Sequence, residues 1–221
     1  MQKTLRLIDT TLGKKAIVAV TGLVLYGFVV VHMIGNLQVF LGPDVFNNYA
    51  ATLKGTPALL WGARFTLLAS IALHVSLSLS LVVESASARP VGYRVRRYKT
   101  TSAAALTMRY GGPALALFIL YHLAHLTFPG VAMGNYQHSP IDAYSNFVNG
   151  FSIWWVAAIY IAAQICLGMH LYHGSWSMLQ TVGLSHPRYE KLLRLGPPAL
   201  GLAVATGNII MVLAVLAGVV H

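Results

Sequence analysis

Five long apolar stretches divide this chain of 221 residues, and no other feature constrains its fold as strongly. The stretches cover residues 16–40, 60–83, 105–128, 151–179 and 198–220. Each is longer than the roughly 18 apolar residues that a helix needs to cross a hydrocarbon core of about 30 Å. Only 9% of the residues are charged, whereas charged residues make up about a quarter of a soluble domain. The sequence therefore predicts an all-α membrane protein, a single domain (1–221) with five transmembrane helices.

The segments between the spans carry weaker signals. Phe46, Tyr49 and Leu53 recur at helical spacing in loop 42–57, which predicts a short helix on the membrane surface. Segment 129–150 is rich in Asn, Tyr, Gly and Pro, so an irregular loop with a short helix is expected there. The pair Pro197-Pro198 is expected to form the first turn of the last span.

The basic residues are divided unevenly between the two sides of the membrane that the five spans define. Thirteen of the fifteen Lys and Arg residues lie before the first span, around the second-to-third connection or around the fourth-to-fifth connection. Only Lys54 and Arg64 fall on the other side. Because cytoplasmic loops carry the excess of Lys and Arg, we expect a multi-pass protein of the cell (inner) membrane with its N-terminus in the cytoplasm and its C-terminus outside. The basic face predicts contacts with membrane lipids and a docked cytoplasmic partner, and no nucleic acid.

Each of the first four spans carries a histidine inside its apolar run: His32, His74, His122 and His170. A titratable ring in the hydrocarbon is costly unless it has a partner. At about 1.5 Å per residue, His32 and His122 fall at an outer level, and His74 and His170 fall at an inner level. Each pair joins alternate helices of an antiparallel four-helix bundle, and such helices face each other across the bundle core.

Two imidazoles on opposite sides of a haem iron leave no open coordination position, which suits electron transfer. The chain has no Cys-x-x-Cys-His motif, so covalently attached haem is excluded. The pattern predicts two b haems, an outer one on His32 and His122 and an inner one on His74 and His170. A zinc site would need clustered Cys, His and carboxylate ligands. A proton relay would need an intramembrane carboxylate, and none of the five acidic residues lies in the middle of a span.

Some alternatives stay open at the level of single residues. Any one histidine could bond a backbone carbonyl across the bundle and bind no metal. His125 and His173 each follow a candidate ligand by three residues, so each lies on nearly the same helix face. Either one could be the ligand instead, bind a haem propionate or contact a quinone. Depth favours His122 over His125, because the deeper ring is better placed for a buried iron.

The fourth span contains the stretch His170-Leu-Tyr-His-Gly-Ser-Trp-Ser177, and a turn with Pro187-Arg188 precedes a fifth span without histidine. With one histidine in each of the first four spans, the chain resembles the cytochrome b membrane anchor subunit of succinate dehydrogenase and fumarate reductase. The resemblance covers nearly the whole chain and is to the single-subunit, five-helix, two-haem type. In that family the fourth-span ligand opens a segment similar to His-x-x-x-Gly-x-Trp-Ser, which aligns with His170 and leaves His173 variable. The third-span ligand aligns better with His122 than with His125.

The resemblance implies a role in complex II, the succinate:quinone oxidoreductase linked to the tricarboxylic acid cycle. An iron–sulfur subunit and a flavoprotein subunit with covalent FAD would dock on the cytoplasmic face and oxidise succinate. Electrons would pass through iron–sulfur clusters, the inner haem and the outer haem to a membrane quinone, commonly menaquinone. Some relatives place a glutamate near the outer haem, whereas here the outer half offers only Asp44 and Asp142 in loops, so the quinone position stays open. Arg64 and Arg109 are expected as propionate or quinone contacts.

Two rival functions remain compatible with the histidine pattern. The cytochrome b subunits of hydrogenases, formate dehydrogenases and nitrate reductases also use pairs of histidines, usually at a different spacing. A haem-free transporter with pore-lining histidines belongs to another class altogether. An optical spectrum separates the transporter from the cytochromes, and the subunits that copurify separate the cytochromes from one another.

Overall fold

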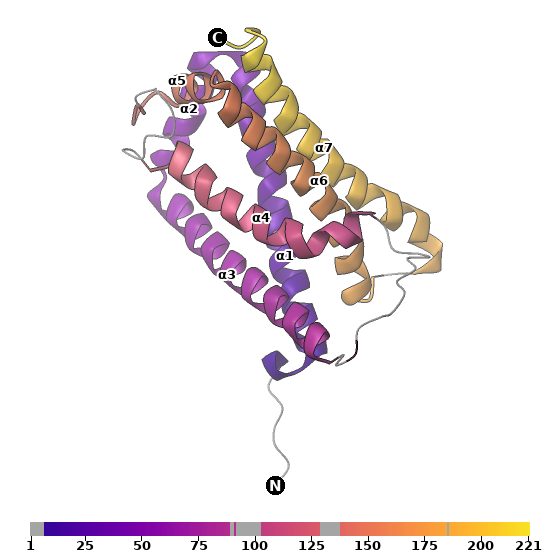
Figure 1. Ribbon diagram of the computed structural model, residues 1–221. Coiled ribbons are helices and arrows are strands. Elements are labelled where there is room, and N and C mark those ends of the chain that lie inside the picture. Colours follow the sequence, from indigo (N-terminus) through magenta and orange to yellow (C-terminus); the bar gives the residue numbers. More distant parts are fainter. Residues whose placement is uncertain (1–6, 89–90, 92–102, 129–137, 185) are drawn as a thin grey trace.

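The computed structural model describes residues 7–88, 91, 103–128, 138–184 and 186–221, and all regular structure among them is helical. Among these residues five helices are long and apolar enough to cross a membrane, so the chain is an all-α, multi-pass membrane protein, as predicted. These helices are α1 (Thr11–Asn36), α3 (Pro57–Ser87), α4 (Ala103–Leu126), α6 (Trp154–Thr181) and α7 (Glu190–Leu216). They run alternately up and down, and the described part of the chain begins and ends at opposite ends of the bundle (Figure 1).

Two short helices cover the end of the bundle where the chain terminates. They are α2 (Pro43–Lys54) and α5 (Ala143–Phe151), which lie side by side next to the end of α7 (Figure 1). We call this region the capped end. The helix predicted in loop 42–57 is therefore confirmed as α2, which begins with Pro43 at its first position after Gly42. Gly42 has a φ of +93°, a conformation that a residue with a side chain rarely adopts, and it turns the chain from the 3-10 segment Leu37–Leu41 into α2.

A buried apolar cluster of the described residues lies at the capped end. A single cluster of buried side chains joins α2, α5, α6 and α7 there. Its members are Val39, Phe46, Phe147, Phe151, Val156, Ala157, Tyr160, Met211, Val212, Val215 and Val220. Asp142 links the two short helices, since its carboxylate accepts hydrogen bonds from the backbone N–H of Ser145 (2.9 Å) and the side-chain amide of Asn47 (3.0 Å). The capped end is thus held by aromatic contacts and by hydrogen bonds between α2 and α5.

Helices α6 and α7 pack closely along their length. A Cβ atom added at Gly201 would lie 2.6 Å from Cβ of Leu171, so these two backbones approach each other more closely than a side chain would allow. Deeper in the pair, the amide of Asn208 donates to Oε1 of Gln164 at 2.9 Å. In contrast, Ser70 is the one buried residue among those of α3. The histidine-bearing helix α3 therefore contributes little to the buried core.

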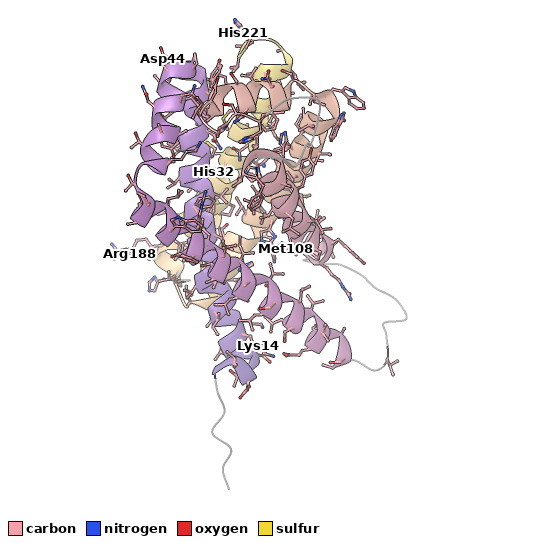
Figure 2. The ribbon with its side chains drawn as sticks, turned by 90° about the vertical axis from the view of Figure 1, so that its left-hand side faces the viewer. Lys14, His32, Asp44, Met108, Arg188 and His221 are labelled. Atoms are coloured by element: carbon pink, nitrogen blue, oxygen red, sulfur yellow. The ribbon has the colours of Figure 1, made fainter. Side chains whose placement is uncertain are left out.

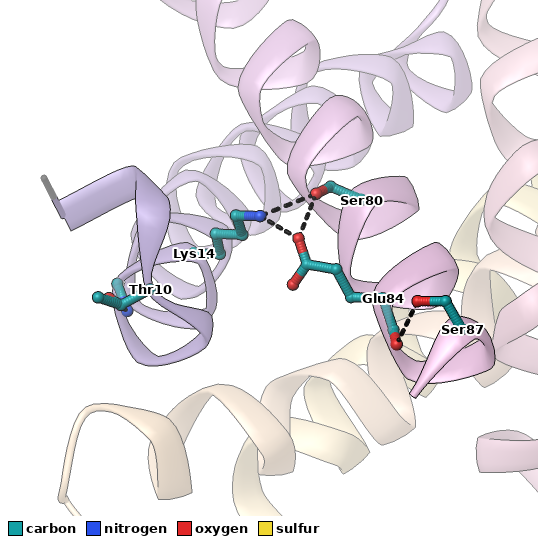
Figure 3. A network of polar contacts seen from close by, with 6 residues as sticks. Thr10, Lys14, Ser80, Glu84 and Ser87 are labelled. Carbon is teal, nitrogen blue, oxygen red and sulfur yellow. Dashed lines mark hydrogen bonds and ion pairs between the residues drawn. The ribbon is translucent and has the colours of Figure 1, made fainter. Parts of the chain in front are cut away.

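Helices α1 and α3 are joined at the end of the bundle away from α2 and α5. Lys14 on α1 forms an ion pair with Glu84 on α3 and donates a hydrogen bond to the Ser80 hydroxyl at 3.0 Å (Figure 3). The Ser80 hydroxyl in turn donates to the Glu84 carboxylate at 3.0 Å. Figure 2 shows Lys14 at this end and Asp44 and His221 at the capped end, with His32 between them. We call the region around Lys14 and Glu84 the N-terminal end.

For the first four predicted spans, most of the predicted boundaries lie within a few residues of the observed helix ends. The fourth was expected to start near residue 151, but Phe151 ends α5 and α6 begins at Trp154. The fifth was placed wrongly at its start, because α7 begins at Glu190 and contains Pro197 and Pro198 in its interior. Pro197 and Pro198 have no backbone N–H to donate to the carbonyls one turn earlier. Near them, the Tyr26 hydroxyl donates to the Pro197 carbonyl at 2.5 Å, and the Glu190 carboxylate pairs with Arg194.

Candidate functional site

The first histidine pair lies near the capped end. His32 is close to the end of α1 and His122 is close to the end of α4, and their ring centroids are 5.8 Å apart with perpendicular ring planes. Phe28, one turn before His32 on the same helix, stacks on the His32 ring with 5.2 Å between centroids. The structure therefore brings a residue of the first span and a residue of the third together in the bundle interior.

The second pair lies deeper in the bundle. His74 and His170 occupy the middle parts of α3 and α6, and their ring centroids are 6.3 Å apart at an interplanar angle of 61°. Thr21 on α1 lies beside His74 and precedes His32 by eleven residues, which at 1.5 Å per residue separates the two pairs by about 16 Å along α1. The bundle thus holds two opposed imidazole pairs at two levels.

The two separations are close to that of two imidazoles bound to one metal ion, and the deeper pair matches it best. An imidazole nitrogen binds a transition metal at about 2.0–2.1 Å and lies about 1.2 Å from its ring centroid, so two rings across one ion have centroids about 6.4 Å apart. The measured centroid separations are 5.8 Å and 6.3 Å. Within the described residues no three His, Cys, Asp or Glu side chains gather into a metal-binding group. A donor set of two opposed imidazoles suits an ion whose remaining ligands come from elsewhere, as the porphyrin nitrogens do in haem.

The Nδ1 atom of His74 is held by α1. It lies 3.1 Å from the Val18 carbonyl oxygen and 3.3 Å from the Thr21 hydroxyl. A ring that donates Nδ1–H to a carbonyl carries its lone pair on Nε2, the nitrogen available to a metal. Gly22 leaves room for this ring, because a Cβ atom added there would lie 3.2 Å from Cε1 of His74. Opposite it, Nδ1 of His170 is buried and has no hydrogen-bond partner among the described residues.

The Nδ1 atom of His122 has a different partner. It lies 3.2 Å from the hydroxyl of Tyr160, and the same hydroxyl lies 2.9 Å from Nδ1 of His125. Across the pair, Nε2 of His32 lies 3.2 Å from the side-chain amide of Asn36 on the same helix. That amide contact would have to open for His32 to bind a metal through Nε2. A metal bound through Nε2 of His122, in contrast, leaves the Tyr160 contact intact.

Tyr160 lies near the start of the fourth span, where aromatic residues commonly line the membrane interface, so the sequence predicts an interfacial side chain there. The structure shows that this prediction is wrong. Its side chain is only 4% exposed and packs against Phe118, Tyr121 and Phe151 in the cluster at the capped end. The burial pattern along α6 explains the position of Tyr160. The buried positions of α6 recur every three or four residues through Tyr160, Gln164, Gly168 and Leu171, so the helical period places Tyr160 on the inward face.

The structure distinguishes the histidines that spacing left ambiguous. The ring facing His32 is that of His122, while the ring of His125 is buried and stacks on Tyr121 with 5.9 Å between centroids. The ring facing His74 is that of His170, and His173 lies half-buried one turn further along α6. These contacts favour His122 as the partner of His32 and His170 as the partner of His74. Their role as metal ligands stays a prediction.

The two arginines lie on exposed surfaces of their helices. The Arg64 guanidinium lies over the Trp61 ring, 5.0 Å from its centroid, and both side chains are exposed. Arg109 is exposed near the start of α4. Their expected contacts with propionates or a quinone stay predictions.

The geometry defines the chain as a multi-pass helical membrane protein with two pairs of opposed histidines in its interior. Searches against protein-family models, curated proteins and solved structures find no match for it.

Proposed function

We propose that this chain is the dihaem cytochrome b membrane anchor of a succinate:quinone oxidoreductase. The observation that carries the proposal is the presence of two opposed imidazole pairs, His32 with His122 and His74 with His170, at two levels of one helical bundle. When bound, two b haems would supply a pair of one-electron carriers stacked along the bundle. The resemblance of the chain to the anchors of this enzyme class supports the choice among cytochromes.

The residues of the chain would hold and shield the cofactors. Each iron would be held by two histidines of the chain, and such ligation leaves no position for oxygen or another small ligand. The Val18 carbonyl and the Tyr160 hydroxyl would fix the ring orientation of His74 and His122. The apolar walls of α1, α3, α4 and α6 would keep water away, and this environment stabilises the less charged ferrous state relative to an exposed haem.

In the proposed complex the chain binds an iron–sulfur subunit and a flavoprotein subunit, and it passes electrons to a membrane quinone, menaquinone in our proposal. The FAD and the iron–sulfur clusters belong to those partner subunits, where the dicarboxylate chemistry takes place. The strong bias of basic residues supports an orientation with the N-terminal end in the cytoplasm and the capped end outside the cell (inner) membrane. In that orientation His74 and His170 would lie nearer to the cytoplasmic partners than His32 and His122.

The haem content of the intact protein tests this function. The chain should be purified from its native membrane in mild detergent and assayed as the pyridine haemochrome. We expect two b haems per chain and a dithionite-reduced spectrum with b-type bands. Flavin and iron–sulfur subunits should copurify, and the complex should reduce a quinone analogue with succinate.

Three outcomes would contradict the proposal in different ways. Protein without porphyrin iron would exclude both kinds of cytochrome and leave the transporter with pore-lining histidines. Two haems accompanied by a hydrogenase, formate dehydrogenase or nitrate reductase subunit would keep the cytochrome and reject the succinate enzyme. A single haem per chain would reject the two-level arrangement of ligands.

A further inference from the structure

The buried hydroxyl of Tyr160 connects two imidazoles of α4. It lies 3.2 Å from Nδ1 of His122 and 2.9 Å from Nδ1 of His125, although Tyr160 itself belongs to α6. The rings of the two histidines also contact the Tyr160 ring, with centroids 5.8 Å and 5.5 Å from it. The Tyr160 phenol therefore contacts both His122 and His125, the two residues whose spacing makes either one a candidate for the ligand of the third span.

Ligation by His122 would fix the direction of both hydrogen bonds. If Nε2 of His122 carries the lone pair for a metal, its proton lies on Nδ1, and Nδ1–H donates to the Tyr160 oxygen. The phenol O–H then donates to Nδ1 of His125, which acts as the acceptor. The chain of donors runs from His122 through Tyr160 to His125, and each group in it uses a different proton.

We propose that Tyr160 is a positioning residue for the ligand at the capped end, and this inference rests on the proposed haem function. Its hydroxyl holds His122 with Nε2 directed into the bundle toward His32. By donating to Nδ1 of His125, it also keeps that second ring among Tyr121 and Phe151, away from His32. Tyr160 thus selects His122 over His125 as the ligand.

The same contact has an electronic consequence. A ligand histidine whose Nδ1–H donates to an acceptor is a more basic ligand, and a more basic ligand stabilises the ferric state. The phenol oxygen becomes a better acceptor when its own proton is engaged by His125, because neighbouring hydrogen bonds strengthen each other. Tyr160 therefore lowers the reduction potential of the haem held by His32 and His122. At the other level a backbone carbonyl, that of Val18, has the corresponding role for His74.

Replacing Tyr160 by phenylalanine tests the inference in the intact complex. Phenylalanine keeps the ring that fills the cluster and removes only the hydroxyl. We expect the potential of the haem at the capped end to become more positive in a redox titration, with a change in its low-spin EPR g-values. The other haem should keep its potential and its g-values.

His32→Ala and His74→Ala variants identify which signal belongs to which pair. Tyr121→Phe is the matched control, because Tyr121 packs on the same rings while its hydroxyl has no partner among the described residues.

A second variant keeps the inference testable if Tyr160→Phe assembles poorly. His125→Phe leaves the Tyr160 hydroxyl as an acceptor for His122 but removes its own acceptor, so a smaller shift in the same direction is expected. Unchanged potentials and g-values in both variants, with two haems bound, would overturn the inference and leave Tyr160 a packing residue. An equal effect in Tyr121→Phe would overturn it as well. The absence of haem from the unsubstituted protein would instead reject the proposed function itself.

Discussion

The two histidine pairs are supported in different ways. His32 and His122 lie beside the aromatic cluster of the capped end, where Tyr160, Phe118 and Phe28 contact their rings. His74 is supported by main-chain and small groups of α1 instead, and its helix has a single buried residue among those described. The first pair is therefore positioned by packed side chains, whereas the second depends on the fit between two helices. A substitution near the second pair should act through the distance between α1 and α3.

The largest expected effect is the loss of one haem while the other stays. Replacing His170 by alanine removes one imidazole of the deeper pair, so its haem should be absent while the haem on His32 and His122 persists. The haem-to-protein ratio should fall by about half, because bis-histidine ligation needs both rings. Pyridine haemochrome assay and a redox titration with one remaining component would establish this result.

The matched control for this substitution is His173→Ala on the same helix. His173 lies one turn away, and its ring is not the one that faces His74, so both haems should be retained. If His170→Ala retained both haems and His173→Ala lost one, the assignment of ligands in α6 would be wrong.

A smaller effect should follow from filling the space at Gly22. The ring of His74 lies so near that an added Cβ atom would be 3.2 Å from Cε1, and a leucine would push the ring away from its position. We expect haem of the deeper pair to be lost on the order of tenfold faster to apomyoglobin, a change of the size seen when support of a metal ligand is disturbed. Gly27→Leu serves as the control, because an added Cβ atom at Gly27 meets no atom within 4 Å. Equal rates of haem loss in the two variants would contradict a role for the α1–α3 fit.

Removing the ion pair at the N-terminal end should have a still smaller effect. Lys14 is largely buried between α1 and α3, where it pairs with Glu84 and Ser80 (Figure 3). Lys14→Met should lower the temperature at which the purified protein unfolds and should broaden the optical bands of the haem on His74 and His170. The exposed neighbour Lys15 provides a control of equal charge change, and Lys15→Met should leave both quantities nearly unchanged. A shift confined to the other haem would show that the two ends are not separately supported.

Much of the architecture was predictable because membrane spans have a strong sequence signal. Long apolar runs and the helical rise placed four spans correctly, and the same rise sorted the four histidines into two levels. The start of the last span was not predictable in this way. Proline is a common first residue of a helix, but Pro197 lies inside α7, where the Tyr26 hydroxyl binds its carbonyl from a helix far away in sequence.

The surroundings of the candidate ligands were harder to predict than the ligands themselves. A buried histidine is visible in the sequence because it interrupts an apolar run, whereas the Val18 carbonyl that holds His74 has no sequence signal at all. Tyr160 looked like an interfacial residue because it lies near the start of its span. Its actual place depends on α5, which folds over the end of α6 and buries it with Phe147 and Phe151.

The smallest expected effect concerns the cap of α5 at the capped end. The pKa of the Asp142 carboxyl lies below its ordinary value, because the Ser145 side chain, the Ser145 backbone N–H and the Asn47 side chain all donate to it. A lowered folded-state pKa means that the carboxylate stabilises the fold fully above about pH 3.9, and that this contribution disappears as the pH falls through the folded pKa. Asp142→Ala should cost about 0.5–1 kcal/mol at neutral pH, the usual loss for a helix cap.

The pH dependence separates the charge of Asp142 from its capping role. Asn is also a good cap, so Asp142→Asn should unfold near the temperature of the unsubstituted protein at pH 7. The small contribution of the charge itself should shrink as the pH falls toward 3, because it is lost as the pH passes down through the lowered folded-state pKa. Thermal unfolding followed by tryptophan fluorescence from pH 7 to pH 3 measures both effects.

Because the Asp142 cap lies in α5, far from His74, its loss should leave the spectrum of the haem on His74 and His170 unaltered. A change in the spectrum of that haem would mean that the capped end supports both histidine pairs. The conclusion that the two pairs are supported separately would then be wrong.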